Sequence, residues 1–163
     1  MQLPLCVNCV TSETYCPSCQ QKLDSGAVSG TERKLCEKIS IYAQRFPLSN
    51  ACFTKALEVG DTVVVLSTQP AALIGRKGAL VLLLTRDFKK RFKIIDPNSH
   101  PSLLIQELIL PARSLGVNTI FKPGAREYKV RVPYHQKKLL PFTPADFSNV
   151  LKQLNVEASI VFE

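Results

Sequence analysis

The residues best suited to chemistry in this chain form a short glycine turn with two cations at its tip. Gly75-Arg76-Lys77-Gly78 is entered from the apolar Ile74 and leads into a helix-forming run. Two glycines let the backbone approach a ligand without Cβ clashes, and the helix that follows would direct free N–H groups at it. Adjacent positive side chains favour a polyanion. The pattern therefore predicts a clamp for a phosphate backbone.

Four of the six cysteines form two Cys-x-x-Cys pairs, Cys6 with Cys9 and Cys16 with Cys19, separated by six residues. Each turn can direct two thiolates at one tetrahedral metal, and a four-thiolate set leaves no open position for catalysis. We expect one structural Zn²⁺ ion in a compact knuckle or a clipped ribbon, because the spacer is shorter than that of a usual ribbon. A redox motif or two disulfides are the alternatives, although a redox motif needs only one pair.

The other two cysteines are expected in the core, because free cysteine is among the most buried residue types. Cys36 falls in a helical pattern beside Leu35 and Ile39, and Cys52 opens a predicted strand.

Composition indicates a globular, basic protein. The 163 residues are 45% hydrophobic and carry a formal charge of +8, and residues 31–100 hold 12 Lys and Arg against 6 Asp and Glu. This excess surrounds the glycine turn and favours a polyanionic partner. We expect no signal peptide, and the longest apolar run, Ala79 to Leu84, is too short to span a bilayer. A cytoplasmic protein with no membrane contact is therefore expected.

The elements around the glycine turn follow from periodicity and turn residues. Residues 1–24 form the cysteine element and residues 25–30 a small-residue linker. Between 31 and 97 the pattern predicts a helix over 31–46, strands over 52–59 and 62–66, a short helix over 70–74, a helix over 80–91 and a strand over 92–95. The expected order is α-β-β-α-α-β, which makes the fold class α+β.

This order, with a GxxG turn between the last two helices, resembles a type II KH domain, the form found in the transcription factor NusA. In that family the turn holds the backbone of single-stranded RNA and the flanking elements form a groove for bases. The resemblance implies RNA-binding roles for Gly75, Arg76, Lys77 and Gly78, with Ile74 lining the groove. With the cysteine element, the whole chain looks similar to small archaeal zinc-ribbon proteins with a NusA-like KH domain.

Further cations follow the turn and have two interpretations. Arg86, Lys89, Lys90 and Lys93 could extend the RNA track along the helix and its exit. Alternatively they form a solvated face whose charges offset the helix macrodipole near its C-terminus.

The segment 98–163 is predicted to form a second α-β-β-α-β unit, either a KH-like domain without GxxG or an independent α+β domain. Its only similar stretch, Pro123-Gly124-Ala125-Arg126, lies in a hairpin and does not head a helix. Lys122, Arg126, Lys129 and Arg131 could contact phosphate, but a polar sheet face is the favoured interpretation. Lys129 and Arg131 alternate with Tyr128, Val130 and Val132, as a half-buried strand requires.

No catalytic constellation is present in the sequence. His100 and His135 have no orienting carboxylate nearby, the acidic residues form no metal-binding pair, and a P-loop motif is absent. We expect a non-catalytic protein with no small-molecule substrate, which binds single-stranded RNA in archaeal transcription, translation or RNA processing. The alternative is an assembly factor of the ribosome or RNA polymerase, whose zinc element docks on protein while its basic surface contacts folded rRNA. An accessory role in RNA decay is a third possibility.

Overall fold

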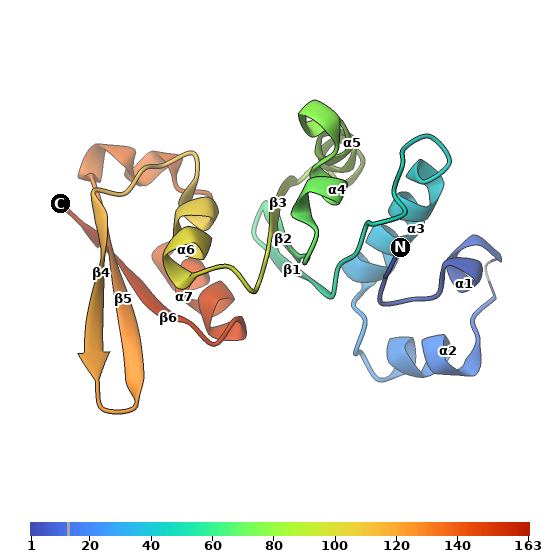
Figure 1. Cartoon of the computed structure of the whole chain (residues 1–163), viewed down its shortest axis with the longest axis horizontal. Helices are drawn as coiled ribbons and strands as arrows, with labels where there is room; N and C mark the ends of the chain where they lie inside the picture. The colour runs from blue at the N-terminus through green and yellow to red at the C-terminus, as the bar shows by residue number, and fades with distance from the viewer. Residues whose placement is uncertain (13) are drawn as a thin grey trace. The chain divides into compact units, whose positions relative to one another are not determined.

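The computed structural model describes residues 1–12 and 14–163. The chain divides into two compact units (Figure 1). The first comprises residues 1–58 and 63–96, and the second comprises residues 59–62 and 97–163. Each unit carries one three-stranded sheet. The predicted α+β class is therefore confirmed, with its four-cysteine element at the N-terminal end.

The cysteine element consists of two short helices, α1 (Val7–Ser12) and α2 (Pro17–Asp24). Each Cys-x-x-Cys pair spans a helix start, with Cys6 just before α1 and Cys16 as the residue that precedes α2. Among the described residues before α3, extended pairing is limited to a single bridge from Gln2 to Cys52. The element is thus helical, and the strands of a clipped ribbon are not formed there.

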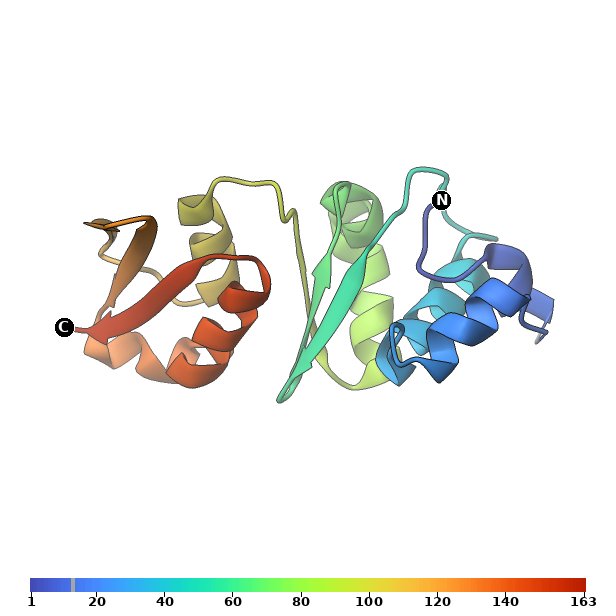
Figure 2. The same ribbon diagram turned by 90° about the horizontal axis from the view of Figure 1, so that it is seen from below.

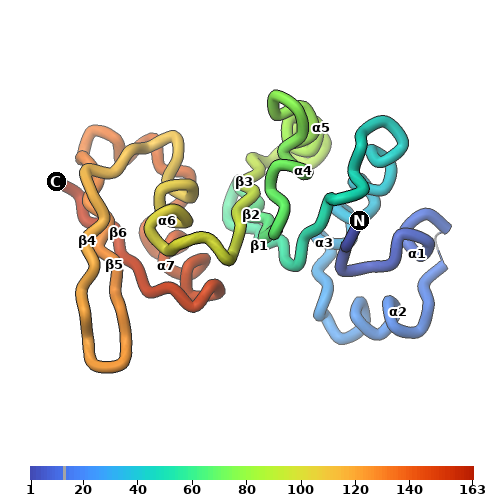
Figure 3. The backbone as a smooth tube through the Cα atoms, viewed as in Figure 1, coloured from blue at the N-terminus to red at the C-terminus, as the bar shows by residue number. Residues whose placement is uncertain are grey.

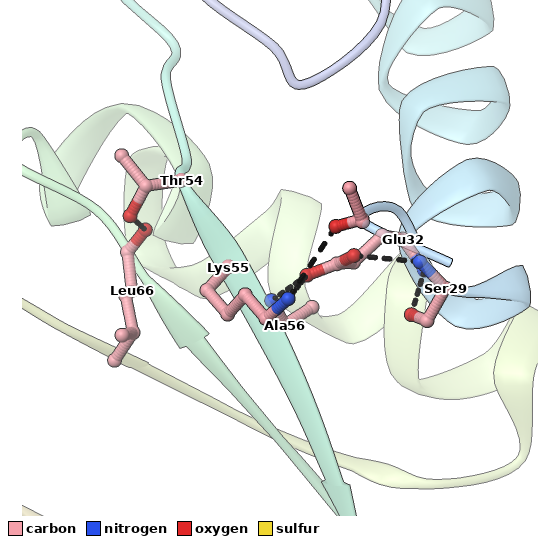
Figure 4. Close-up of polar contacts among 7 residues, drawn as sticks. Ser29, Glu32, Thr54, Lys55, Ala56 and Leu66 are labelled. Atoms are coloured by element: carbon pink, nitrogen blue, oxygen red, sulfur yellow. Dashed lines mark hydrogen bonds and ion pairs between the residues drawn. The ribbon is translucent and has the colours of Figure 1, made fainter. Parts of the chain in front are cut away.

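Helix α3 (Gly30–Tyr42) begins with a capping box that ties it to the sheet. The Ser29 hydroxyl accepts from the Glu32 N–H, and the Glu32 carboxylate accepts from the Ser29 N–H at 2.8 Å. Glu32 is 1% exposed and also accepts from the Ala56 N–H at 2.9 Å. Figure 4 shows this carboxylate between the helix start and the first strand. At the boundary of the predicted linker, the buried Glu32 therefore joins the start of α3 to the first strand.

The first sheet has the order β1-β2-β3, formed by Lys55–Val59, Thr62–Leu66 and Arg91–Ile95. All five residues of β2 are buried, as expected for the central strand of a covered sheet. The helices of the unit lie on one side of this sheet in Figure 2. Cys36 is fully buried as predicted, but Cys52 precedes β1 and is only half-buried, so its predicted place in the core is wrong.

Between β2 and β3 the chain forms α4 (Pro70–Ile74), a 3-10 turn over Arg76–Gly78, and α5 (Ala79–Phe88). Leu73, Leu80 and Leu84 are at most 1% exposed and anchor both helices in the core. The predicted order of elements is confirmed from α3 to β3, although α5 ends at Phe88 because Lys89 takes a left-handed conformation.

The second unit contains α6 (Pro101–Ile109), β4 (Gly116–Lys122), β5 (Ala125–Val132), α7 (Pro144–Gln153) and β6 (Glu157–Phe162). Its sheet has the order β4-β5-β6, with β4 antiparallel and β6 parallel to β5. Tyr128, Val130 and Val132 are buried, so the predicted alternation is confirmed. Figure 3 traces the β4–β5 hairpin as a long loop, and Phe121 near its tip is 75% exposed.

The two units repeat one order of elements and one order of strands. In both, a helix precedes two adjacent strands, and a helical connection leads to a third strand beside the second. The connections, residues 67–90 and 133–156, have equal length. In the second unit a 3-10 segment (Tyr134–Leu139) stands in place of α4, and Leu140-Pro141-Phe142-Thr143 stands in place of Gly75-Arg76-Lys77-Gly78.

Candidate functional site: a metal centre and a glycine loop

The four cysteines predicted as metal ligands lie together. The Sγ atoms of Cys6, Cys9, Cys16 and Cys19 are all within 4.8 Å of one another. Four thiolates around a tetrahedral zinc would be about 3.8 Å apart, given Zn–S bonds of about 2.3 Å. The cluster could therefore hold a metal ion after small adjustments of the side chains.

Backbone amides donate hydrogen bonds to two sulfur atoms of this cluster. The Cys6 N–H donates to Cys19 Sγ at 3.4 Å, and the Cys16 N–H donates to Cys9 Sγ at 3.3 Å. Each pair of cysteines thus receives a hydrogen bond from the other. These reciprocal bonds orient the sulfur atoms, as outer contacts commonly do in metal sites.

Four thiols in so small a space cannot all ionise easily on their own. The hydrogen bond and charge of Cys19 raise the pKa of Cys6 to about 11. The backbone amide of Cys19, with the neighbouring thiols, lowers the pKa of Cys16 to about 7. The pKa of Cys16 is thus lowered while that of Cys6 is raised, as expected when ionisable groups lie in contact. A divalent cation would remove this conflict by neutralising the shared charge.

The four-cysteine cluster is joined to the core of the first unit. Cys9 and Cys19 are buried, and they belong to the same hydrophobic cluster as Leu5, Leu35 and Ile39. A bound metal would therefore hold α1 and α2 against α3 as well as against each other.

The glycine loop has a backbone that requires glycine at its first position. Gly75 has φ 76° and ψ 169°, and a Cβ there would lie 2.9 Å from Leu80 Cβ and 3.0 Å from Leu80 N. Gly78 has φ 76° and ψ 14°, with open space for a Cβ apart from Val81 at 3.7 Å. Lys77 between them is also left-handed, with φ 54°. The Gly78 N–H donates to the Gly75 carbonyl at 3.0 Å and closes the turn.

The cations of the loop are exposed at the start of α5. Arg76 and Lys77 both face solvent, and Ile74 is 37% exposed just before them. The first turn of α5 contains no acidic residue, so no carboxylate of that turn would repel an anion bound at the loop. The Gly78 and Ala79 N–H groups donate to the carbonyls of Gly75 and Arg76, so the loop offers mainly two side-chain charges and an apolar neighbour on one short segment.

The other predicted RNA-contacting cations lie at the far end of α5. Arg86 approaches Asp87 at 3.6 Å, and Lys90 forms an ion pair with Glu58. The helix rises about 15 Å over its ten residues, so a track from the loop to these cations would have to follow its length. Lys89 is exposed and Lys93 lies in β3. Their roles in RNA binding stay predictions.

In the second unit the basic hairpin is partly neutralised. Lys122 pairs with Glu127 at 2.5 Å, and Arg131 lies 3.8 Å from Glu163. Arg126 is placed over the ring of Phe121, 5.6 Å from its centre. These contacts agree with the favoured interpretation of a polar sheet face.

Two features of the first unit were missed by sequence reasoning. The pattern Ser29-Gly30-Thr31-Glu32 is a capping box that could have been recognised from its spacing. A cluster of Tyr42, Asp87 and Lys38, which joins α3 to α5, has no local signal because Asp87 is far from the other two in the chain.

Comparisons with known proteins leave the family open. No family model matches the chain, and no curated protein matches it. A solved structure described as "Crystal structure of APE1850" is similar, with 17% identity and a TM-score of 0.49 over 77% of this chain and 95% of that chain. We draw no functional conclusion from that likeness. No helix in the described part of the chain is long and apolar enough to cross a membrane.

Proposed function

We propose that this protein is a non-catalytic RNA-binding protein that grips a single-stranded RNA backbone with the loop Gly75-Arg76-Lys77-Gly78. The observation that carries the proposal is the geometry of this loop. Two positive-φ glycines bring the backbone close to a ligand, and two exposed cations stand where α5 begins. These are the features by which a GxxG loop clamps backbone phosphates.

The surroundings of the loop support a type II KH unit. Helix α3, the hairpin β1–β2, the helices α4 and α5 and the strand β3 follow in the order that this fold requires. The loop lies between the last two helices. A base next to the clamped phosphates would meet Ile74, whose exposed apolar surface can stack or pack against it.

We further propose that the cysteine cluster holds one structural Zn²⁺ ion. All four donors are thiolates, and soft thiolate ligands in a tetrahedral set favour zinc. The ligands would be Cys6, Cys9, Cys16 and Cys19, which leaves no position for substrate. Zinc would then contribute to folding of the first unit, and a cytoplasmic location fits its reduced thiols.

The RNA proposal is tested by reversing both loop charges. A variant with Arg76→Asp and Lys77→Asp should bind a fluorescent pool of random 12-nucleotide RNAs about 100-fold more weakly, because it loses two charge-assisted contacts of about 1.5 kcal/mol each. Fluorescence anisotropy at fixed salt measures the change. The fold should persist, since both side chains are exposed.

A matched control separates local contact from net charge. The variant with Arg45→Asp and Lys152→Asp changes the charge of the chain equally, at two other exposed positions. It should lose less than about fivefold in affinity, because neither position belongs to the loop and a change in net charge alone is screened at physiological salt. Equal losses in the two variants would show that the loop has no special role.

A ribosome- or polymerase-associated assembly factor is the rival function. In that case short oligonucleotides would bind weakly, while the protein would co-sediment with ribosomal subunits or polymerase. The anisotropy assay and a sedimentation assay together distinguish the two functions.

A further inference from the structure

A short segment of the second unit combines exposed aromatic and basic side chains. The 3-10 segment Tyr134–Leu139 has the sequence Tyr-His-Gln-Lys-Lys-Leu, and none of its residues is buried. It lies within residues 128–145, which contain four Lys or Arg and no Asp or Glu. Carboxylates of its own stretch of chain therefore do not offset its charge.

This segment takes the place that the first unit gives to the helix before the glycine loop. It precedes Leu140-Pro141-Phe142-Thr143, as α4 precedes Gly75-Arg76-Lys77-Gly78. Both segments lie in the connection that follows the middle strand of a sheet. The second unit therefore lacks the glycine turn at this place but carries cations beside it.

Tyr134 offers an accessible ring. The residue is 67% exposed, and its main chain is fixed because the Tyr134 N–H donates to the Glu163 carbonyl at 2.7 Å. Its ring meets that of Phe162 edge to face, with the ring centres 6.3 Å apart. A ring that is supported on one side and open to solvent on another can stack on a flat partner.

The two lysines of the segment have no carboxylate partner. Lys137 Nζ lies 5.6 Å from the ring centre of Tyr134 and 5.3 Å from that of Phe162. Within the described part of the chain, neither Lys137 nor Lys138 forms an ion pair. The cations of the β4–β5 hairpin differ, because two of them pair with glutamates. A polyanion at the 3-10 segment would therefore compete with no internal carboxylate.

Arg113, in the connection before β4, brings a further cation to the segment. Its N–H donates to Gln136 Oε1 at 2.6 Å, and the residue is exposed. Cations from two separate parts of the chain therefore come together at this place.

We propose that Tyr134, Lys137 and Lys138 form a second contact for single-stranded RNA, in which Tyr134 stacks on a base and the lysines bind neighbouring phosphates. Aromatic rings beside basic side chains hold single strands in this way without a glycine clamp. The proposal rests on the proposed RNA binding, because it takes the same class of ligand. An acidic protein segment would also match the lysines, but the accessible ring between them and solvent favours a ligand with flat bases.

The test measures fluorescence anisotropy of a pool of random 30-nucleotide RNAs with the full-length, metal-loaded protein. Tyr134→Ala should weaken binding about fivefold or more, which is the cost of losing one stacked base. Tyr134→Phe keeps the ring and should stay within about twofold of the wild type. Because Tyr134 is exposed, both variants should unfold in urea at nearly the same midpoint as the wild type.

The lysines are tested by reversing both charges. Lys137→Glu with Lys138→Glu should lower the affinity and make the slope of log affinity against log salt shallower by about 1.4, at about 0.7 for each lost phosphate contact. The matched control is Lys129→Glu with Lys152→Glu, because both are exposed cations of the same unit outside the segment. The control should leave the salt slope unchanged.

The outcomes separate this proposal from that for the glycine loop. If reversal of Arg76 and Lys77 abolishes binding while Tyr134→Ala leaves it unchanged, the second contact is refuted and the loop proposal stands. If Tyr134→Ala weakens binding and reversal of the loop charges does not, the second contact stands without the loop. Equal losses in Tyr134→Ala and Tyr134→Phe, or in the lysine reversal and its control, would overturn the proposal. Docking on an acidic protein instead of RNA would leave RNA binding unchanged in every variant of the segment, and that result would overturn it too.

Discussion

The two glycines of the loop should differ sharply in how they tolerate alanine. At Gly75 the combination of φ 76° and ψ 169° lies in a region that is essentially restricted to glycine, at a cost of about 1–3 kcal/mol for other residues. The new Cβ would also meet Leu80 Cβ at 2.9 Å and Leu80 N at 3.0 Å. Because the second atom is backbone, rotation of a side chain cannot relieve the contact, and overpacking adds about 1–3 kcal/mol.

At Gly78 the strain is smaller. Its φ of 76° and ψ of 14° are left-handed helical values, which cost about 1–2 kcal/mol in an L-residue. The nearest side-chain contact of a Cβ would be an ordinary 3.7 Å to Val81. Alanine also reduces the conformational entropy of the unfolded chain, which offsets about 0.4–1 kcal/mol of the lost stability in either variant. The net losses in free energy of unfolding are therefore about 3 kcal/mol for Gly75→Ala and about 1 kcal/mol for Gly78→Ala.

Urea unfolding of the metal-loaded protein, followed by circular dichroism, measures the difference. Gly124→Ala is the control, because Gly124 has φ 74° and open space around its Cβ position. It should behave like Gly78→Ala. If Gly75→Ala and Gly78→Ala lost equal stability, the steric argument for the first glycine would be incorrect.

Four further predictions concern the metal, the core, pH and salt. Cys16→Ser should lower bound zinc, measured by elemental analysis, from about one ion per chain to a small fraction. Glu32→Ala should lower the free energy of unfolding by about 3 kcal/mol in urea, because it leaves the buried N–H of Ala56 and the part-buried N–H of Ser29 without their acceptor. Hydrogen bonding from Tyr42 lowers the pKa of Asp87 below its ordinary 3.8. The ionised Asp87 side chain therefore stabilises the fold fully above pH 3.8, and this contribution is lost as the pH falls through the lowered pKa. Thermal unfolding of wild type should then depend on acid more steeply than that of Asp87→Asn. The slope of log affinity for RNA against log salt should become shallower by about 1.4 in the loop double variant, at about 0.7 for each of two lost phosphate contacts on a single strand.

Much of the element order could be predicted from the sequence because its signals are local. Periodic apolar residues, glycine turns and prolines at helix starts predicted β2 and α4 at their observed bounds, and predicted the other helices and strands from α3 to β3 to within a few residues. Helix ends were less predictable, since Lys89 ends α5 through a left-handed conformation that lysine rarely adopts. Cys52 was misplaced because a single cysteine carries no information about which neighbours will cover it.

Sequence spacing also placed the four thiols near one another, because each Cys-x-x-Cys turn is a local geometry. It could not determine that α1 and α2 are helices or that they pack on α3, since those contacts join residues distant in the chain. The strand order in the two sheets shows that the connections of the two units have equal length. It also shows that Leu140-Pro141-Phe142-Thr143 of the second unit takes the place of the glycine loop.

The sequence by itself determined the composition of the two candidate sites: four thiolates at metal-binding spacing, and a GxxG loop with Arg76 and Lys77 at its tip. Tertiary structure decided why Gly75 has to be glycine, since Leu80 occupies the place of its Cβ. It also decided that the Ser40 hydroxyl of α3 is buried without a hydrogen-bond partner among the described residues. Local spacing fixes which groups a short segment offers, whereas burial and steric exclusion depend on residues that only folding brings together.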